Sequence, residues 1–303
     1  MNNFSQKDFI KKVSGLVGME LSIIEQLQSR EGFSFRVKGN SQEMLIKFID
    51  INTNNATQRQ RVKSLKNEAK ILIELAKFSN DTYISSGTLD TTVWILRKWI
   101  DGITVWEHTK YIRANPQLQE NKQKFIESLI HMVKKVIQLN KLGYLHGDLQ
   151  PNHFLIDNNE RVHLIDLEVS VQMDQKDTGY IGALLHFVSP ETAEGMLKEK
   201  LNIPLDLMSE IYSFGAVSFF LYTGYTANSY GESPASNQIK GIEKNDKLTA
   251  ITLGKTRTFS QIDAEPFPDF ESVIMKCLSL QRTNRFKNFE ELLISLELIL
   301  NDL

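Results

Sequence analysis

The chain contains 303 residues, enough for one large domain or for two lobes that each bury a core. Hydrophobic residues make up 41% and charged residues 24%, a composition that argues against bulk disorder. The 35 Lys and Arg residues against 37 Asp and Glu residues give a formal net charge of -2. This balance excludes a whole-chain basic field that would attract nucleic acid or an anionic membrane, and we expect neither as a partner.

The chain has a single cysteine, Cys277, so an intrachain disulfide is impossible, and a reducing compartment fits best. The N-terminal residues MNNFSQKDFIKKVSGL mix charges into their apolar positions and lack the uninterrupted apolar core of a signal peptide. No run approaches the roughly 20 apolar residues of a membrane span. We therefore expect a soluble, cytoplasmic protein.

Strand and helix patterns follow one another in a clear order. Strand patterns run over residues 21–96 and include the alternation of Phe33, Phe35 and Val37, whereas the chain after the Asp101-Gly102 turn is mostly helical. The expected helices are residues 4–17, 58–77, 122–142, a segment that begins near 208, 270–280 and 289–300. This order predicts an α+β protein in which a small β-rich part precedes a larger helical part.

Two carboxylates stand at the ends of short apolar runs. Asp148 lies in GYLHGDLQPNHFLI, directly behind His-Gly, and Asp166 lies in VHLIDLEVS. Carboxylates in such places are typical of proteins that bring a hydroxyl and a metal-bound phosphate together. The rest of the sequence decides whether the two aspartates form such a site or lie in these places by chance.

Upstream, a lysine and a glutamate lie on two neighbouring predicted elements. Lys47 is in MLIKFI, on the third predicted strand, and Glu68 is in KNEAKIL, on the following helix. An ammonium group can neutralise nucleotide phosphates when a carboxylate orients it. Each residue alone is more often a solvent-facing charge, but together and in order the two become a strong signal.

With these motifs in sequence, residues 21–300 resemble the Hanks-type (eukaryotic-like) protein kinases, in a bacterial variant that carries H-G-D. The resemblance implies a bilobal protein-kinase-like fold, with a small β-rich N-lobe and a larger, mostly helical C-lobe. We expect an N-terminal helical extension at residues 1–20, the N-lobe at 21–100 and the C-lobe at 101–303, which together form a single kinase domain. The implied cofactors are ATP and Mg²⁺ or Mn²⁺.

The resemblance also assigns roles to residues. Asp148 is implied to accept the proton of the attacking hydroxyl, and His146 is expected to pack rather than to act as a base. The catalytic residues implied are Asp148, Lys47, Glu68 and Gln150; the nucleotide-binding residues are Gly32, Phe33, Ser34, Lys47, Lys98, Trp99 and Asp166; the metal-binding residues are Asp166, His153 and Asn152.

Motifs further along the chain favour a protein kinase over a small-molecule phosphotransferase. Val188–Glu191, VSPE, resembles A-P-E, and Ser209–Gly215, SEIYSFG, resembles the start of the central C-lobe helix. Arg285 matches the arginine that pairs with the A-P-E glutamate. We therefore predict a structural ion pair between Glu191 and Arg285.

Several positions depart from the family pattern. His153 stands where the metal-binding asparagine is expected, and Asn152 lies one position early. Either His153 coordinates weakly, or a one-residue shift lets Asn152 reach the metal, or a single metal is used. Gln150 replaces the usual lysine, and Leu184 replaces a threonine whose hydroxyl braces the catalytic aspartate.

The other departures concern the nucleotide site and activation. Only Gly32 remains of the glycine-rich loop, Arg97 stands at the gatekeeper position, and Glu168 replaces the glycine of D-F-G, where Leu167 can still pack as phenylalanine would. Gly147 replaces the arginine that would sense a phosphate in the activation loop, so activation by phosphorylation there is not expected.

These observations leave three functions open. The favoured one is a kinase that transfers the γ-phosphate of ATP to a Ser/Thr-type hydroxyl of a protein or peptide. The second is a pseudokinase that acts as a nucleotide-binding scaffold. The third is a kinase for a small molecule or a biosynthetic peptide precursor. The sequence leaves the substrate and the oligomeric state open.

Overall fold

The computed structural model describes residues 5–27, 32–50, 56–78, 82–173, 184–200, 203, 205–231 and 241–303. The chain divides into two compact units, Met1–Asp101 and Gly102–Leu303, and each is described by itself. No helix in these described ranges is long and apolar enough to cross a membrane.

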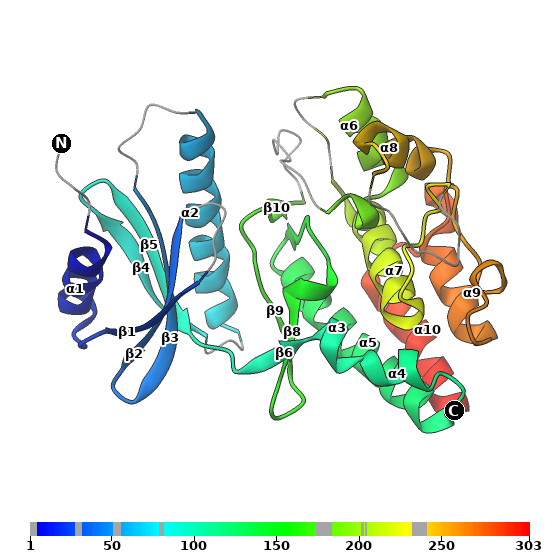
Figure 1. The fold of residues 1–303 in the computed structure, drawn as a ribbon, viewed down its shortest axis with the longest axis horizontal. Helices are drawn as coiled ribbons and strands as arrows, with labels where there is room; N and C mark the ends of the chain where they lie inside the picture. The colour runs from blue at the N-terminus through cyan, green and yellow to red at the C-terminus, as the bar shows by residue number, and fades with distance from the viewer. Residues whose placement is uncertain are drawn as a thin grey trace. The chain divides into compact units, whose positions relative to one another are not determined.

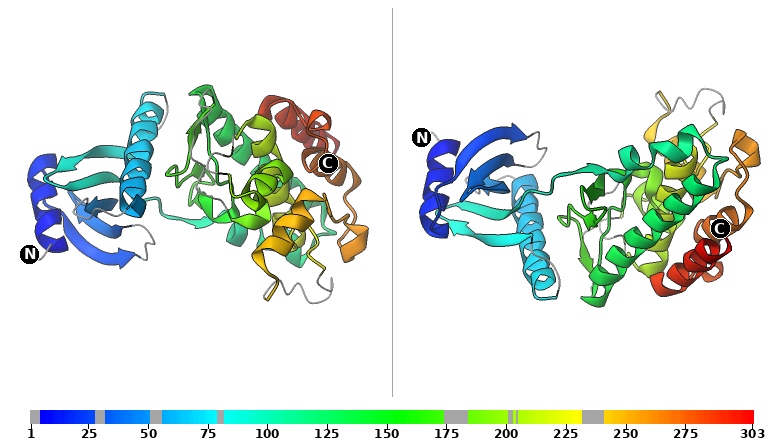
Figure 2. Two further views of the ribbon diagram at one scale, coloured as in Figure 1. Left: turned by 90° about the horizontal axis from the view of Figure 1, so that it is seen from above. Right: turned by 90° about the horizontal axis from the view of Figure 1, so that it is seen from below.

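The first unit is an antiparallel sheet with one helix against each face (Figures 1 and 2). The five strands lie in the order β1-β2-β3-β5-β4, so β1 and β4 form the edges. The elements of this unit are α1 (Gln6–Val17), β1 (Ser22–Leu27), β2 (Phe33–Gly39), β3 (Gln42–Asp50), α2 (Ala56–Ala76), β4 (Tyr83–Leu89) and β5 (Thr92–Lys98).

Side-chain alternation along the strands separates the two faces of this sheet. Because successive residues of a strand point to opposite faces, Met44, Ile46 and Phe48 of β3 point one way and Lys47 points the other. The first set joins Phe9, Ile10 and Val13 of α1 and side chains of β2 and β5 in one buried cluster. The predicted N-terminal helix therefore shares a core with the sheet, and the opposite face, with Lys47, belongs to α2.

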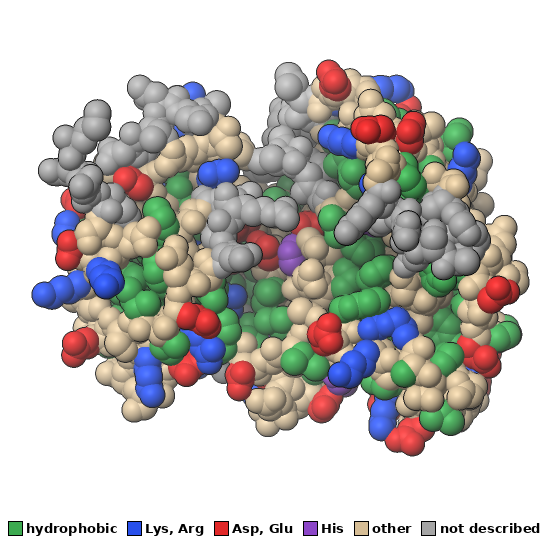
Figure 3. Space-filling view, viewed as in Figure 1, with side chains coloured by type: hydrophobic (Ala, Val, Ile, Leu, Met, Phe, Trp, Pro, Cys, Tyr) green, Lys and Arg blue, Asp and Glu red, His purple; other side chains and the backbone are tan. Residues whose placement is uncertain are grey.

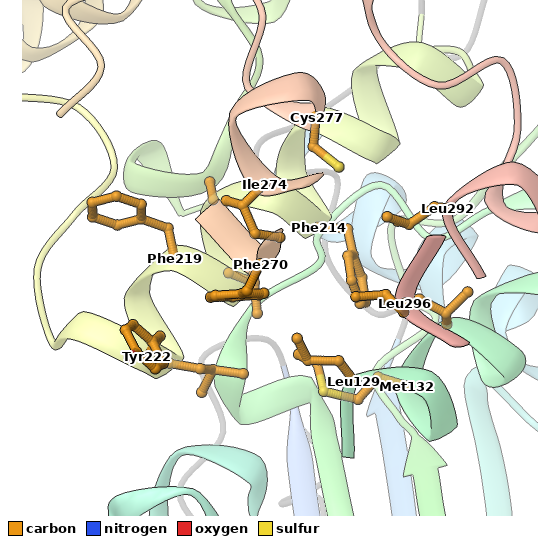
Figure 4. Close-up of a cluster of buried hydrophobic side chains, with 14 of the residues drawn as sticks. Leu129, Met132, Phe214, Phe219, Tyr222, Phe270, Ile274, Cys277, Leu292 and Leu296 are labelled. Atoms are coloured by element: carbon orange, nitrogen blue, oxygen red, sulfur yellow. The ribbon is translucent and has the colours of Figure 1, made fainter. Parts of the chain in front are cut away.

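The second unit is mostly helical, as predicted. Its helices are α3 (Val105–His108), α4 (Lys110–Ala114), α5 (Gln119–Lys141), α6 (Pro190–Leu197), α7 (Leu207–Thr223), α8 (Lys244–Thr252), α9 (Pro268–Cys277) and α10 (Phe289–Asp302). Helix α5 packs against α10, and α7 packs against α9. Residues of these four helices meet in one large hydrophobic core, part of which is drawn in Figure 4.

Helix α7 lies inside this core. Its buried side chains occur on all sides of the helix, which begins with an Asp206–Ser209 capping box. A helix that is apolar all round is stable only when it is surrounded by protein. Cys277 is buried against the same core, and burial raises the pKa of its thiol to about 12, so it is a packed side chain and not a reactive one.

Two small sheets carry the segments with the two aspartates. Strands β6 (Gly102–Thr104), β8 (Phe154–Asp157) and β9 (Val162–Leu164) form one antiparallel sheet, and β7 (Tyr144–Leu145) pairs with β10 (Val171–Gln172). Asp148 lies in the loop after β7, and Asp166 follows β9. The sheets thus fix both ends of each loop, which gives the side chains in the loops defined positions.

Candidate active site

In the first unit, Lys47 and Glu68 form an ion pair. The Lys47 Nζ atom lies 3.1 Å from Glu68 Oε2 and 3.4 Å from Oε1. The Glu68 side chain is only 3% exposed and that of Lys47 is 20% exposed. A carboxylate buried to this degree needs hydrogen-bond donors or a cationic partner. Lys47 is such a partner, so the pair holds the ammonium group on the α2 face of β3.

Among the predicted nucleotide residues, Ser34 lies closest in register to Lys47. Ser34 and Lys47 are directly paired across β2 and β3, so both side chains point to the same face. Phe33 instead packs its ring against Phe48, 5.3 Å away between centroids, on the α1 face. Only the backbone of Phe33 remains as a candidate contact for the nucleotide.

Gly32 precedes β2 at a place where no side chain fits. A Cβ atom built there would lie 2.7 Å from the Phe48 carbonyl oxygen and 2.7 Å from a side-chain carbon of Ile49. The rest of the eroded glycine-rich loop, residues 28–31, lies outside the described residues. Packing therefore requires a glycine at position 32, in addition to the predicted contact of Gly32 with the nucleotide.

Lys98 and Trp99 lie where β5 ends. The Lys98 backbone N–H donates to the Thr82 carbonyl oxygen at 2.7 Å, and the Trp99 N–H donates to that of Glu43 at 2.9 Å. The Arg36 guanidinium lies 4.6 Å from the centroid of the Trp99 ring, a cation–π contact. Both residues are thus fixed by the sheet, and one face of the Trp99 ring is covered by Arg36.

In the second unit, Asp148 is held by neighbours on both carboxylate oxygens. The Gln150 side-chain amide donates to Oδ2 at 2.9 Å, and the Leu184 backbone N–H donates to Oδ1 at 3.2 Å. Burial raises the pKa of Asp148, against the opposing effect of these donors and of His153. The missing threonine hydroxyl is therefore replaced by a main-chain donor at the same position, Leu184.

The backbone before Asp148 is also fixed. His146 is fully buried; its Nδ1 accepts from the Asp148 N–H at 3.2 Å and its Nε2 lies 3.0 Å from the Ile165 carbonyl oxygen. This arrangement fits a neutral ring, and burial lowers the pKa of His146 to about 4. His146 packs and orients the loop, as expected.

Gly147 is required by its surroundings. Its φ is +81°, a conformation that favours glycine, and a Cβ atom would lie 2.8 Å from the Val169 carbonyl oxygen. The central glycine of H-G-D thus allows this path of the chain.

Glu210 of α7 is a residue of the site for which the sequence had suggested no role. Its carboxylate accepts from the backbone N–H groups of His146, at 2.5 Å, and Gly147, at 3.0 Å. The Asn140 side chain also donates to it at 3.3 Å. Burial raises the pKa of Glu210 to about 7. The sequence signal was available, since an acidic residue near the start of a wholly apolar helix needs buried donors.

His153 links Asp148 to Asp166. Its Nδ1 lies 2.8 Å from the Asp148 carbonyl oxygen, and its Nε2 lies 3.2 Å from Asp166 Oδ2. Burial acts to lower the pKa of His153, but the hydrogen bond and charge of Asp166 together with Asp148 raise it. With an oxygen acceptor at each ring nitrogen, the imidazole is engaged as a donor on both sides.

This geometry decides how the predicted metal ligands fit Mg²⁺. Asp166 presents a carboxylate that is 41% exposed, a hard oxygen donor of the kind Mg²⁺ takes. His153 does not fit, because both of its ring nitrogens already face protein oxygens. Asn152 is exposed, and no described cluster of three or more His, Cys, Asp or Glu residues is placed to hold a metal. Of the predicted metal ligands, Asp166 therefore offers a carboxylate that suits Mg²⁺, and His153 does not.

The turn that contains Asp166 is well defined. Asp166 has a φ of +64°, within the left-handed region that aspartate tolerates better than most residues. Leu167 is 1% exposed, which confirms that it packs as a phenylalanine would. The burial of Leu167 anchors the turn and leaves the Asp166 side chain partly exposed.

The predicted pair of Glu191 and Arg285 is confirmed. Arg285 Nη1 lies 2.8 Å from Glu191 Oε1, and Nη2 lies 3.0 Å from Oε2. The Arg285 side chain is fully buried and also donates to the carbonyl oxygens of Ser279 and Met208. This bidentate pair ties the start of α6 to the segment before α10.

Comparison with known proteins shows that this sequence is similar to those of protein kinases. The model of the protein kinase domain family matches residues 31–295. A probable serine/threonine-protein kinase of Clostridium acetobutylicum is 22% identical over 244 residues, which cover 80% of this chain and 34% of that protein. A second, from Clostridium perfringens, is 23% identical over 244 residues and 32% of its length.

A third, less similar relative matches a comparable share of its own length. The serine/threonine-protein kinase PknB of Mycolicibacterium smegmatis is 21% identical over 206 residues, which cover 66% of this chain and 29% of that protein. The chain thus spans about a third of the length of these curated relatives.

Proposed function

Because the chain belongs to the protein kinase domain family, we propose that it is an ATP- and Mg²⁺-dependent kinase, able to use Mn²⁺ as well, that phosphorylates a Ser/Thr-type hydroxyl of a protein or peptide. The observation that carries the proposal is the Asp148 carboxylate, held on one oxygen by Gln150 and on the other by Leu184. A base fixed in this way is ready to receive a proton without first reorganising.

In the proposed reaction, the substrate hydroxyl oxygen attacks the γ-phosphorus of ATP. The new O–P bond forms as the bond to the leaving ADP oxygen breaks, and the hydroxyl proton passes to Asp148. Gln150 and Leu184 hold the carboxylate toward the hydroxyl. Glu210 acts through the backbone of His146 and Gly147 and is a positioning residue.

Charge neutralisation is the second part of the proposal. Lys47, oriented by Glu68, contacts the phosphates, and Asp166 holds the magnesium ion, which supplies positive charge beside the phosphates. Ser34 lies on the face of Lys47 and is a candidate to donate a hydrogen bond to phosphate. We further propose the backbone of Gly32 and Phe33 for the phosphates, and Lys98 and Trp99 for the adenosine. Asn152 and His153 are not needed as metal ligands.

One observation favours a second candidate, a nucleotide-binding pseudokinase. The Asp166 Oδ2 atom faces the His153 imidazole, so the histidine competes for an oxygen that a magnesium ion would use. If that contact persists when nucleotide binds, the protein would bind nucleotide without efficient transfer.

The bacterial H-G-D assignment and the cytoplasmic location remain predictions.

Transfer of radiolabelled γ-phosphate tests the proposal. The protein is incubated with Mg²⁺ or Mn²⁺ and with labelled ATP, alone and with a panel of peptide acceptors and small molecules, and wild type is compared with Asp148→Asn and Asp166→Asn. Label transfer that both substitutions abolish supports the kinase. Nucleotide-dependent thermal stabilisation without transfer to any acceptor supports the pseudokinase instead, and transfer to small molecules alone points to the third function.

A further inference from the structure

The sheet face that carries Lys47 also carries an arginine beside the position proposed for the nucleoside. Lys47 pairs with Ile95 across β3 and β5, and Leu45 pairs with Arg97. The four side chains therefore point to the same face of the sheet. Along the chain, Arg97 stands between Ile95, which lies opposite Lys47, and Trp99. A nucleotide with its phosphates at Lys47 and its nucleoside at Trp99 thus passes Arg97.

Leu45 forms an apolar floor at this position. It is 5% exposed, and it is directly paired with Arg36 of β2 on one side and with Arg97 of β5 on the other. A flat purine ring gains free energy when it covers apolar surface of this kind. A ring placed there has one arginine on each side, so the two guanidinium groups decide which hydrogen bonds its edges meet.

Arg36 is held by carboxylates of its own sheet. Its Nε donates to Glu43 at 2.7 Å, and its Nη1 donates to Glu25 at 3.4 Å. The guanidinium also covers one face of the Trp99 ring. The positive charge of Arg36 is thus matched within the sheet, and its position is fixed by these contacts.

Arg97 is placed differently. Its Nη1 atom lies 3.5 Å from the Lys98 carbonyl oxygen, so the guanidinium lies against the main chain at the end of β5. A guanidinium carries five N–H donors and no acceptor, and this contact uses one of them. Arg97 can therefore offer a base only donors, which selects for a base edge made of acceptors.

The two common purines differ at the edge that such a group reads. Guanine presents two acceptors, O6 and N7, whereas adenine presents the N7 acceptor beside an N6 amino group, which is a donor. Arginine pairs with both acceptors of guanine at once, but it meets a donor at N6 of adenine. A 6-oxopurine therefore suits Arg97 better than adenine does.

The overall charge of the protein gives no competing reason for a preference among bases. On the face drawn in Figure 3, the described basic and acidic residues are interspersed, and the chain has a net charge of -2. The phosphates are also the same in every nucleotide. Selectivity among bases has to come from local donors and acceptors, of which the Arg97 guanidinium is one.

We propose that the nucleotide site binds 6-oxopurine nucleotides, such as GTP, more tightly than ATP, through hydrogen bonds from the Arg97 guanidinium to O6 and N7. GTP then serves as a phosphoryl donor beside ATP, and the transfer step differs only in its leaving group, which is GDP instead of ADP. The inference rests on the proposed function, because it requires a nucleotide with its phosphates at Lys47. It makes Arg97 a specificity-determining residue.

Calorimetric titration with nucleoside diphosphates tests this preference, because diphosphates bind without transferring a γ-phosphate. The probes are ADP, GDP and IDP, each with Mg²⁺, and the protein is the full chain. We expect GDP and IDP to bind at least about tenfold more tightly than ADP. IDP has the O6 acceptor but lacks the 2-amino group of guanine, so equal affinities for GDP and IDP identify O6 as the group that is recognised.

Substitutions of Arg97 assign the selectivity to this residue. Arg97→Gln should reverse the preference, because glutamine pairs with N6 and N7 of adenine. Arg97→Met removes the donors and should bring the three affinities to within about threefold of one another. Arg59→Met is the matched control, because Arg59 is exposed on α2 and lies about 14 Å along the helix from Glu68; it should keep the wild-type preference. Thermal unfolding of each variant confirms that it is folded.

The outcomes separate this inference from the proposed function. Equal binding of the three diphosphates by wild type, or tighter binding of ADP, overturns the inference and leaves the proposed function standing. Absence of binding by all three overturns both. A preference for GDP that IDP does not share would place the selectivity at the 2-amino group and overturn the role of O6. A preference that survives in Arg97→Met would overturn the role of Arg97.

Discussion

The backbone N–H of Leu184 donates a hydrogen bond to Asp148 Oδ1 at 3.2 Å. This contact brings a main-chain donor to the carboxylate at the position where the family pattern has a threonine hydroxyl. A main-chain donor does not depend on the side chain at residue 184, which is why a leucine is compatible with the proposed chemistry.

Removal of that donor should therefore slow phosphoryl transfer. Leu184→Pro deletes the N–H, and the φ of Leu184, -64°, is one that proline adopts without strain. A hydrogen bond to a charged group contributes about 1.5–3 kcal/mol, so we expect a fall of about 10- to 100-fold in transfer rate. Leu184→Ala keeps the N–H and serves as the control. Equal rates in the two variants would show that the hydrogen bond does not position Asp148.

Loss of one partner of the Glu191–Arg285 pair should destabilise the second unit. Arg285 is fully buried, so Glu191→Ala leaves an uncompensated buried charge, at a cost of about 3–5 kcal/mol in the free energy of unfolding. Urea denaturation measures it, with Glu290→Ala, at an exposed site, as the control. The Glu191→Ala/Arg285→Met double variant should recover part of the loss. A cost below about 1 kcal/mol would mean that the pair behaves as a surface ion pair.

Replacement of His153 should change the number of metal ions bound. His153→Asn removes the imidazole that faces Asp166 Oδ2 and supplies an amide oxygen, a better ligand for a hard ion. Titration of Mn²⁺ in the presence of a non-hydrolysable ATP analogue, followed by electron paramagnetic resonance, should give one ion per chain for wild type and two for the variant. Two ions in wild type would contradict the single-metal arrangement.

Low pH should destabilise the fold at the end of β8. Hydrogen bonds from His163 and from the backbone N–H groups of Arg161 and Asn159 lower the pKa of Asp157 to about 2, although burial acts in the opposite direction. A depressed carboxyl pKa stabilises the fold fully above the ordinary value of about 4 and loses this contribution as pH falls toward 2. Asp157→Asn should lower the urea midpoint at pH 6 and have less effect at pH 3. An equal effect at both pH values would rule out this linkage.

The fold was largely predictable because helix and strand patterns depend on residues that are close together in the sequence. The six predicted helices appear as α1, α2, α5, α7, α9 and α10, with ends that shift by a few residues. The short helices α3, α4, α6 and α8 were not predicted, since four to nine residues carry too little periodicity to reveal a helix. Phe33 was expected at the nucleotide site, but its side chain packs against the buried cluster that contains Phe35 and Val37.

The candidate site was predictable in its residues but not in its contacts. The resemblance to the protein kinases implied that Lys47 pairs with Glu68 and Glu191 with Arg285, and both pairs are present. Spacing could not show that His153 lies between Asp148 and Asp166, because that depends on the orientation of one ring. Nor could it show the Leu184 contact, because a backbone donor leaves no trace in the identity of a side chain.

The most direct test of the central claim is to measure nucleotide binding and phosphoryl transfer together in Asp148→Asn. The substitution keeps the size of the side chain but removes the carboxylate that receives the proton. The proposed mechanism predicts ATP affinity within about threefold of wild type and a loss of transfer in single-turnover measurements of at least about 100-fold. Transfer at the wild-type rate would contradict the account, because Asp148 would then not be the group that accepts the proton.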